Sequence, residues 1–193
     1  LIYSRQGAKG RPGILGSGWE FTHDYIIKNL NGTVADSADD FYTLFLNGRS
    51  EKLVINGSDQ LKTEVEYGVR IDSHLGANTS IGNYCVITTK DGAQYRFGYT
   101  SDSELNSGAS TIWNLDQAMD TYGNTIDYSY LENPYAEDVG AAYLYKIEYN
   151  RDNSRVIRLN YESTVRPDNR QVVREGGYFD ESRRLSSIEV LAD

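Results

Sequence analysis

The sequence predicts an all-β fold, and three observations lead to this prediction. The 193 residues include 16 Tyr and 18 Gly, which are typical of strands and of the turns between them. Short runs of alternating apolar and polar residues follow one another along the chain, as in half-buried strands. No window keeps apolar residues at the helical spacing i, i+3, i+4 and i+7. We therefore expect antiparallel hairpins in series and no helix of ordinary length.

The beginning of the chain combines strand-like runs with a glycine-rich loop. Residues 1–3 have the composition of a strand, and residues 19–27 alternate like another. The segment between them, Gly7–Gly18, lacks the Gly-Lys-Ser/Thr of a phosphate-binding loop, and no helical pattern follows it. We interpret it as a loop whose glycines permit positive φ and close approach of the backbone beneath a large Trp ring.

Two Asn-Gly pairs predict tight hairpins in the next part of the chain. Residues 41–46 precede Asn47-Gly48, and residues 52–55 precede Asn56-Gly57. Asn-Gly suits the two positive-φ positions of a type I′ turn. Further strands are expected at 65–71, 83–89 and 94–98, with a turn at Asp91-Gly92. Residues 98–110 are expected to be an exposed polar loop, and residues 132–142 a loop with room for a short helical turn.

Charge and cysteine content exclude several functional classes. The formal net charge is −9, the isoelectric point is near 4.7, and the mean hydropathy is −0.57. Lys and Arg are not massed as nucleic-acid or anionic-membrane binding requires. No run approaches the roughly 18–20 apolar residues of a spanning helix. Cys85 is the only cysteine, so an internal disulfide and a multi-cysteine metal site are excluded, and we expect it to be a buried apolar residue.

A weak repeat in the last third, 119–193, predicts hairpin units. Its copies are residues 119–130, 149–161 and 179–188. Each has an apolar or aromatic residue near an Asp, then a short polar stretch and an alternating run. In the first copy, Asp120 suits the start of a type I turn and Gly123 the left-handed position after it. We therefore interpret Asp120 as a turn-forming residue and not as an acid catalyst.

This unit resembles the Tyr-Asp-x-x-Gly-Arg/Asn-Leu motif of the YD-repeat family. Gly123 matches its glycine, whereas Ser154 and Arg183 stand where the other copies would have one. The order of motifs along nearly all of the chain resembles the N-terminal region of Rhs proteins, of insecticidal toxin complex B components and of the Salmonella plasmid virulence B protein. The motifs are Tyr3-Ser4, Gly16-Ser17-Gly18-Trp19, Asp40-Phe41-Tyr42, Leu46-Asn47-Gly48, residues 91–98, Trp113-Asn114-Leu115, residues 120–124 and Arg166-Pro167-Asp168.

The resemblance implies a structural function. Residues 1–193 would be a single all-β region, with the hairpins in one extended, curved sheet that is a segment of a hollow β-shell. The expected partners are the rest of the same polypeptide, the C-terminal toxin segment that the shell encloses, and other toxin-complex subunits. A secreted or cell-surface location follows, with no cofactor. We also expect a longer polypeptide, because the chain starts on a strand-like run without Met or a signal segment.

An enzyme is not expected from these residues, although acids are plentiful. The candidates for a glycosidase pair are Asp39, Asp40, Glu64, Glu66, Asp116 and Asp120. Such chemistry needs two carboxyls facing each other across a cleft, and no defined pair emerges, so we expect solvated acidic surface. The two histidines, His23 and His74, lie in no catalytic motif. Residues 36–40 offer oxygen ligands for Ca²⁺ but lack the EF-hand pattern.

The alternative hypothesis is a secreted carbohydrate-binding or adhesion module. Trp19 and Trp113 are its candidate binding residues, because aromatic faces stack on sugars while Asn and Asp supply hydrogen bonds. Single aromatic residues in alternating runs are more often core residues or cross-strand partners.

Overall fold

The computed structural model describes residues 2–3, 14–16, 19–20, 23–36, 38–56, 58, 60–66, 68–75, 83–150, 154–169 and 172–192. These parts contain strands and turns but no helix, which confirms the all-β prediction. The strands are β1 (Ile2–Tyr3), β2 (Trp19–Glu20), β3 (Tyr25–Asn29), β4 (Phe41–Leu46), β5 (Arg49–Ile55), β6 (Leu61–Thr63), β7 (Arg70–His74), β8 (Tyr84–Thr88), β9 (Gln94–Phe97), β10 (Glu104–Ser107), β11 (Ser110–Met119), β12 (Thr125–Glu132), β13 (Ala142–Tyr149), β14 (Arg155–Tyr161), β15 (Val172–Arg174), β16 (Gly177–Phe179) and β17 (Leu185–Ala192).

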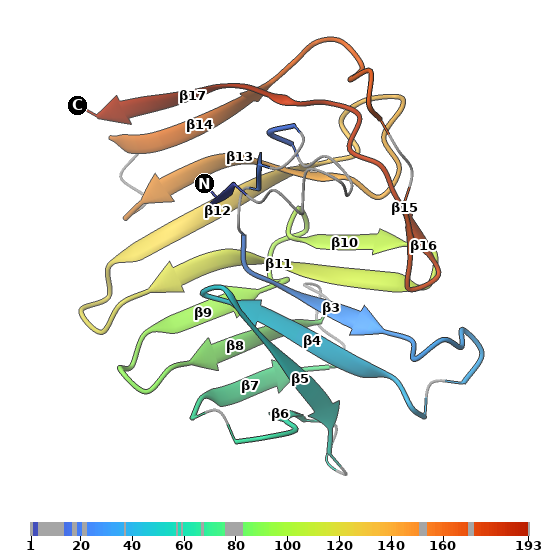
Figure 1. Ribbon diagram of the computed structural model, residues 1–193. Helices are drawn as coiled ribbons and strands as arrows, with labels where there is room; N and C mark the ends of the chain where they lie inside the picture. Colours follow the sequence, from blue (N-terminus) through green and yellow to red (C-terminus); the bar gives the residue numbers. More distant parts are fainter. Residues whose placement is uncertain are drawn as a thin grey trace.

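One antiparallel sheet of 13 strands dominates the fold (Figure 1). Its main path runs β17-β14-β13-β12-β11-β3-β4-β5-β6, and the pairs β1–β2 and β15–β16 form two small separate sheets. Most neighbours in the path are also neighbours in the sequence, so the sheet is a series of hairpins. The expected extended, curved sheet of serial hairpins is confirmed.

The ten-residue strand β11 is the branch point of the sheet. Its first half pairs with β3 through Ile112–Asn114, and its second half pairs with β9 through Leu115–Met119. The path therefore divides into one arm of β3 to β6 and another of β9, β8 and β7 (Figure 1). Both arms contribute to one hydrophobic cluster: Ile26, Tyr42, Leu44, Leu46, Leu53 and Leu61 from the first, Cys85, Ile87 and Phe97 from the second, and Trp113 and Leu115 from β11.

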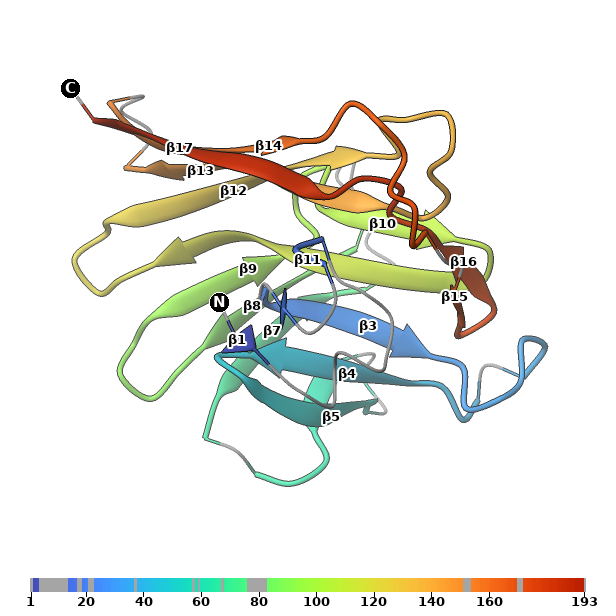
Figure 2. The same cartoon turned by 45° about the horizontal axis from the view of Figure 1, so that its top comes forward.

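The strands on the other side of β11 form a single curved layer. Figure 2 shows β12, β13, β14 and β17 in succession, with β17 at the end of the sheet. A smaller cluster of Tyr130, Leu144 and Leu159 lies on this layer. The two halves of the sheet thus differ, because two arms enclose the larger core, whereas the smaller core lies on one layer of strands.

Local turn chemistry explains the best-predicted hairpins. Asn47 and Gly48 have φ of 52° and 76°, and Leu46 pairs directly with Arg49, which confirms the two-residue turn. The turn at Gly92, with φ of 86°, connects β8 to β9 as predicted. A two-residue turn at Asn56-Gly57 is wrong, because residues 56–60 connect β5 to β6. There the Asn56 side chain accepts hydrogen bonds from the backbone N–H groups of Ser58 and Gln60, at 2.9 and 3.0 Å. Gly57 itself lies outside the described residues.

Three other segments differ from the sequence expectations. The supposed exposed loop at 98–110 contains β10, with Leu105 and Ser107 buried. The strand expected at 65–71 is β7, which starts only at Arg70. Residues 132–142 contain a turn closed by a 3.0 Å hydrogen bond from the Asp138 N–H to the Tyr135 carbonyl, and no helical turn.

The repeat copies meet different outcomes. The first forms the β11–β12 hairpin, and the second spans the β13–β14 hairpin, whose turn at 151–153 lies outside the described residues. The third does not form a hairpin, because β16 pairs with β15 while β17 returns to pair with β14. The hairpin interpretation of that copy is wrong, since its two ends join different sheets.

Candidate functional site

The candidate acids lie on separate elements, and most are committed to structural contacts. Asp40 forms a 2.7 Å ion pair with Lys28, and Glu64 a 2.8 Å pair with Lys52. The Asp39 carboxylate accepts a 2.9 Å hydrogen bond from the Asn31 side chain. Glu66 is exposed in the connection between β6 and β7. No opposed pair of these carboxyls is formed across a described cleft.

Asp116 is buried, contrary to the expectation of a solvated acidic surface. It lies at the irregularity in β11 where the register with β9 shifts. One carboxylate oxygen accepts from Arg96 Nε at 2.6 Å, and the other accepts from the Tyr99 N–H at 2.7 Å. Burial raises the pKa of Asp116 above the usual range, while Arg96 and the Tyr99 N–H act in the opposite direction. These two hydrogen bonds connect β11 to the end of β9 at the branch point of the sheet.

Asp120 forms the turn that the repeat motif predicted. Its Oδ1 accepts hydrogen bonds from the N–H groups of Tyr122 and Asn124, at 2.8 and 2.9 Å, and Oδ2 accepts from Asn124 Nδ2 at 2.7 Å. Gly123 has φ of 85°, the left-handed position expected there. The Asn124 side chain, together with these N–H groups, lowers the pKa of Asp120. A carboxyl held ionised in this way suits a turn and not a general acid.

The histidines and the cysteine take part in no described catalytic arrangement. His23 stacks near Tyr25 and His74 stacks on Tyr84, with ring centroids 5.0 and 4.2 Å apart. Cys85 is buried in the main core as expected, and burial raises the pKa of its thiol to about 12. Asp36 accepts a 3.0 Å hydrogen bond from the Ala38 N–H. Among the residues described, no three His, Cys, Asp or Glu side chains gather as a metal site, and no helix could span a membrane.

The two candidate sugar-binding tryptophans have different outcomes. Trp113 is only 1% exposed and stacks on Tyr42 within the main core, with ring centroids 5.3 Å apart. Its ring therefore offers no face to a sugar in this structure. Trp19 lies in β2 opposite Tyr3, and its side chain lies outside the described part. Trp113 is therefore a core residue and not a candidate for sugar binding.

The two ends of the main sheet path differ in how they are protected. At one end, β6 has only three residues, and its Leu61 N–H donates to Ser73 Oγ of β7 at 2.9 Å. At the other end, β17 has eight residues, of which Ile188, Val190 and Leu191 are 46%, 72% and 41% exposed. Edge strands are normally shortened, charged, bulged or covered. In β17 these features are confined to its first residues and to one charge, Glu189: the register with β14 shifts between Leu185 and Ser187, and the Leu185 N–H donates to the Ile14 carbonyl at 2.8 Å. The β17 edge is therefore suited to pairing with another strand.

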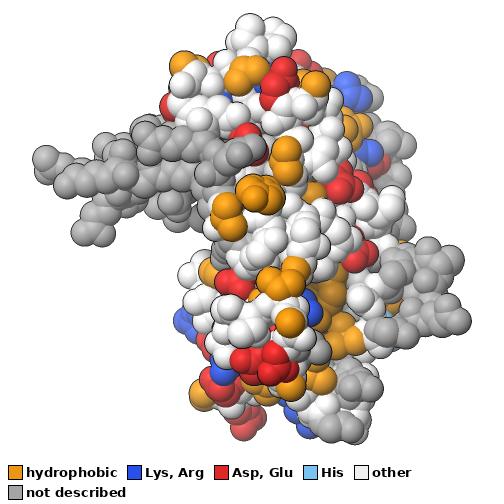
Figure 3. Space-filling model, turned by 90° about the vertical axis from the view of Figure 1, so that its right-hand side faces the viewer, with side chains coloured by type: hydrophobic (Ala, Val, Ile, Leu, Met, Phe, Trp, Pro, Cys, Tyr) orange, Lys and Arg blue, Asp and Glu red, His pale blue; other side chains and the backbone are white. Residues whose placement is uncertain are grey.

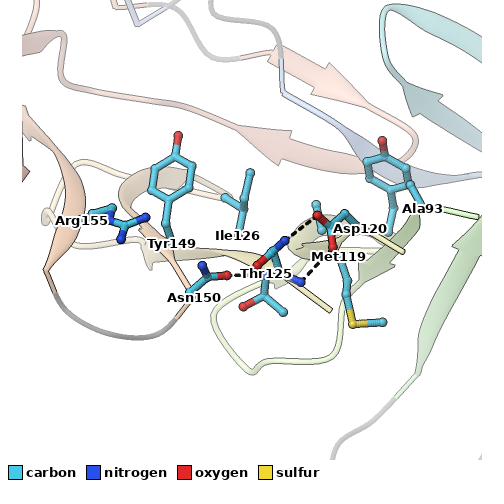
Figure 4. A pocket seen from close by; sticks show the side chains of 11 residues that line it. Ala93, Met119, Asp120, Thr125, Ile126, Tyr149, Asn150 and Arg155 are labelled. Atoms are coloured by element: carbon cyan, nitrogen blue, oxygen red, sulfur yellow. Dashed lines mark hydrogen bonds between the residues drawn. The ribbon is translucent and has the colours of Figure 1, made fainter. Parts of the chain in front are cut away.

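A surface hollow of about 320 Å³ lies across β9, β11, β12 and β13, next to the β11–β12 turn (Figure 4). Its floor and walls come from directly paired positions on four neighbouring strands: Tyr95, Ala118, Ile126 and Tyr149. Arg155 of β14 also lines it. These residues were not singled out in the sequence, because the pairing of distant strands brings them together.

The β15–β16 hairpin attaches the last part of the chain to earlier strands. Ser107 Oγ donates to the Tyr178 carbonyl and accepts from the Tyr178 N–H, at 2.5 and 3.1 Å. The Leu30 N–H donates to Glu175 of the hairpin turn at 2.8 Å. On this side, Val34 and Val173 are 70% and 67% exposed. Figure 3 shows the hydrophobic side chains of the described residues on this side in several separate groups among charged and polar atoms.

Asp168 forms ion pairs with two arginines, and these pairs make the stability of the fold depend on pH. It accepts from Arg166 Nε at 2.9 Å and from Arg184 Nη2 at 2.7 Å. Arg166 is the first cause that lowers the pKa of Asp168 in the folded chain. A lowered carboxyl pKa contributes stability above the unfolded value of about 3.9, and this contribution disappears as the pH falls toward the folded value.

We therefore expect Asp168→Asn to lower the melting temperature modestly at neutral pH and to flatten its decline below about pH 4. Because Asp168 is partly exposed, solvent screening limits the effect. Circular dichroism melts from neutral pH to about pH 2 measure both slopes. Parallel pH profiles for the two proteins would contradict the assignment.

Comparison with known proteins places the fold among toxin-related structures. No family model and no curated protein matches the chain. The N-terminal domain of effector protein SpvB from Salmonella typhimurium strain LT2 has a TM-score of 0.74 and 16% identity, over 96% of this chain and 79% of that one. TcdB2-TccC3 has a TM-score of 0.74 and 13% identity, over 95% of this chain and 12% of that one. The Tc holotoxin pore of Photorhabdus luminescens has a TM-score of 0.67 and 13% identity, over 92% and 11%.

At these identities the likeness concerns the fold, and the chain spans only a small part of the toxin-complex chains. It confirms, at the level of fold, the resemblance that motif order predicted. The chain has the fold shared by the SpvB N-terminal domain and by part of TcdB2-TccC3.

Proposed function

We propose that this chain is a non-enzymatic structural segment of a secreted or cell-surface Rhs/toxin-complex-like protein. It helps to build a hollow β-shell, of the kind made from YD repeats, that encloses a C-terminal toxin segment. The observation that carries the proposal is the long, exposed β17 edge at the end of a long sheet.

The asymmetry of the sheet supports this function. The β3–β6 arm and the β9–β7 arm enclose a common core, and a hydrogen bond from the Leu61 N–H to Ser73 Oγ joins their ends. This side of the sheet therefore needs no further strand. The layer of β12, β13, β14 and β17 is curved and ends at β17 (Figure 2). A segment at the start of a shell wall needs one closed end and one edge strand that can pair with the next strand of the wall. The partners are then the rest of the same polypeptide, its enclosed segment and neighbouring toxin-complex subunits.

The structural neighbours also support it. TcdB2-TccC3 and the Tc holotoxin pore contain this fold as a small part of much longer chains, and SpvB is an effector protein. The absence of catalysis is part of the proposal. It is supported by the commitment of Asp40, Asp116 and Asp120 to ion pairs and turn hydrogen bonds.

Association through β17 tests the open edge. We expect the isolated chain to associate with increasing concentration, since β17 pairs with strands of other copies. Val190→Lys should reduce this association, because a lysine on an edge strand opposes pairing, while the melting temperature stays nearly unchanged at this exposed site. Sedimentation velocity and light scattering over a concentration series measure the effect.

Val65→Lys is the matched control. Val65 is 71% exposed, like Val190 at 72%, but it lies in the connection between β6 and β7. It should leave association unchanged. A wild-type chain that stays monomeric at every concentration, or equal behaviour of the two variants, would contradict the edge assignment.

Electron microscopy of the full-length polypeptide tests enclosure itself. A hollow particle with this fold in its wall is expected, and the enclosed segment should resist protease until the shell is opened. A solid particle, or a C-terminal segment cleaved as fast in the intact protein as in the denatured one, would exclude the shell.

A further inference from the structure

The hollow beside the β11–β12 turn owes its shape to a small residue between large ones. Ala118 of β11 is paired with Tyr95 on one side and with Ile126 on the other, and Ile126 is paired with Tyr149. Tyr95 and Tyr149 are thus three strand spacings apart, roughly 14 Å. With only a methyl group at Ala118, the space between the rings is left open, and it amounts to about 320 Å³.

The hollow has one cationic end. Arg155 is exposed, lines the hollow near Tyr149, and forms no ion pair with any residue in the described parts of the chain (Figure 4). Asp120 lines it at the Met119 side, away from Arg155 in Figure 4, and its carboxylate oxygens are occupied by the Asn124 and Tyr122 hydrogen bonds. Among the lining residues that the structure describes, Arg155 is therefore the cationic partner for a negative group.

We propose that this hollow binds a planar aromatic ring that carries a carboxylate. The ring lies over Ala118 and Ile126 between the two tyrosines, and the carboxylate pairs with Arg155. The walls supply apolar and aromatic contact area, and the volume lies at the lower end of the range found for ligand pockets, about 300–1,000 Å³. A guanidinium binds a carboxylate through two parallel hydrogen bonds, so an unpaired arginine at the rim selects for this group.

The same chemistry comes from two sources, a free aromatic acid or a peptide with an aromatic side chain beside an acidic one. Both fit a hollow that is open to solvent, and the two arms of the experiment separate them. The inference does not depend on the shell function, since every residue that it uses lies in the described part of this chain.

Binding is tested on the whole chain with hydrocinnamate in one arm and the capped peptide acetyl-Gly-Phe-Asp-Gly-amide in the other. Isotope-edited NMR should show shifts at Ala118, Ile126 and Tyr149 with a Kd on the order of 1 mM for a ligand of this size. Binding of hydrocinnamate alone identifies a small-molecule site, and tighter binding of the peptide identifies a polypeptide site. Hydrocinnamamide, which keeps the ring but lacks the charge, should bind at least about fivefold more weakly.

Two variants examine the two halves of the site. Arg155→Gln should weaken hydrocinnamate at least about fivefold, and Arg158→Gln is its control, because Arg158 is an exposed arginine of the same strand that does not line the hollow. Ala118→Leu should abolish binding by filling the hollow, and a melting curve shows whether that variant stays folded. No shifts with either probe up to about 20 mM, or equal weakening by Arg155→Gln and Arg158→Gln, would overturn the proposal.

Discussion

Replacing Asp116 with alanine should lower the free energy of unfolding by about 3–5 kcal/mol, because it removes one partner of a buried ion pair. The side chain of Asp116 is fully buried and that of Arg96 is 20% exposed, and their atoms are 2.6 Å apart. Without the carboxylate, the Arg96 charge and the Tyr99 N–H lose their acceptor at the point where the sheet divides. Equilibrium unfolding in urea measures the loss as a lower midpoint with an unchanged slope.

Asp72→Ala is the matched control. Asp72 also pairs with an arginine, Arg70 at 2.9 Å, but these side chains are 47% and 71% exposed. Surface pairs of this kind contribute less than about 1 kcal/mol. Similar losses for Asp72→Ala and Asp116→Ala would show that the burial of Asp116 has no energetic consequence. The fold of the branch would then depend on backbone pairing alone.

The parts of the fold that were predictable from sequence are those decided by neighbouring residues. Asn47-Gly48 supplies both positive-φ positions of its turn, and the Asp120 carboxylate reaches N–H groups only two and four residues away. The same reasoning was wrong for Asn56-Gly57, because the Asn56 side chain stabilises a longer connection. A prediction from a local pattern is wrong where another local conformation satisfies the backbone N–H groups equally well.

The segment 98–110 was missed because small polar residues can be buried as well as exposed. Ser103, Ser107 and Ser110 are at most 7% exposed. The absence of a side chain at Gly177 allows the β16 backbone to come close to them, since a Cβ on Gly177 would lie 2.3 Å from the Ser107 carbonyl oxygen and 3.0 Å from Ser110 Cβ. Composition alone suggested a solvated loop, whereas the contact with a hairpin more than sixty residues later decides the structure.

The candidate sites were harder to predict, because they depend on strand register between distant segments. The hollow needs Tyr95, Ala118 and Tyr149 on adjacent strands, and no spacing within one run reveals this. Asp116 belongs to an alternating run like any other acid, and only the double pairing of β11 buries it. The β17 edge had a sequence signal, namely an eight-residue run with Glu189 as its sole charge.

Gly98→Ala should destabilise the chain by about 2–4 kcal/mol, since the change adds both backbone strain and a steric clash. Gly98 follows β9 with φ of 75°, and a Cβ there would lie 2.7 Å from two atoms of the buried Trp113 ring. The ring cannot withdraw, because it is enclosed by the main core and stacks on Tyr42. Differential scanning calorimetry and urea unfolding measure the loss.

Gly48→Ala separates the two contributions. Gly48 has nearly the same φ, 76°, but an added Cβ there meets no atom within 4 Å. Its substitution should therefore cost only the left-handed backbone strain, about 1–2 kcal/mol. The difference between the variants isolates the contact of Gly98 with Trp113. Equal losses would mean that the Trp113 ring can move, and so that the core at the branch point is loosely packed. A larger loss at Gly98 would mean that the Trp113 ring is held firmly against the backbone of residue 98 at the branch point.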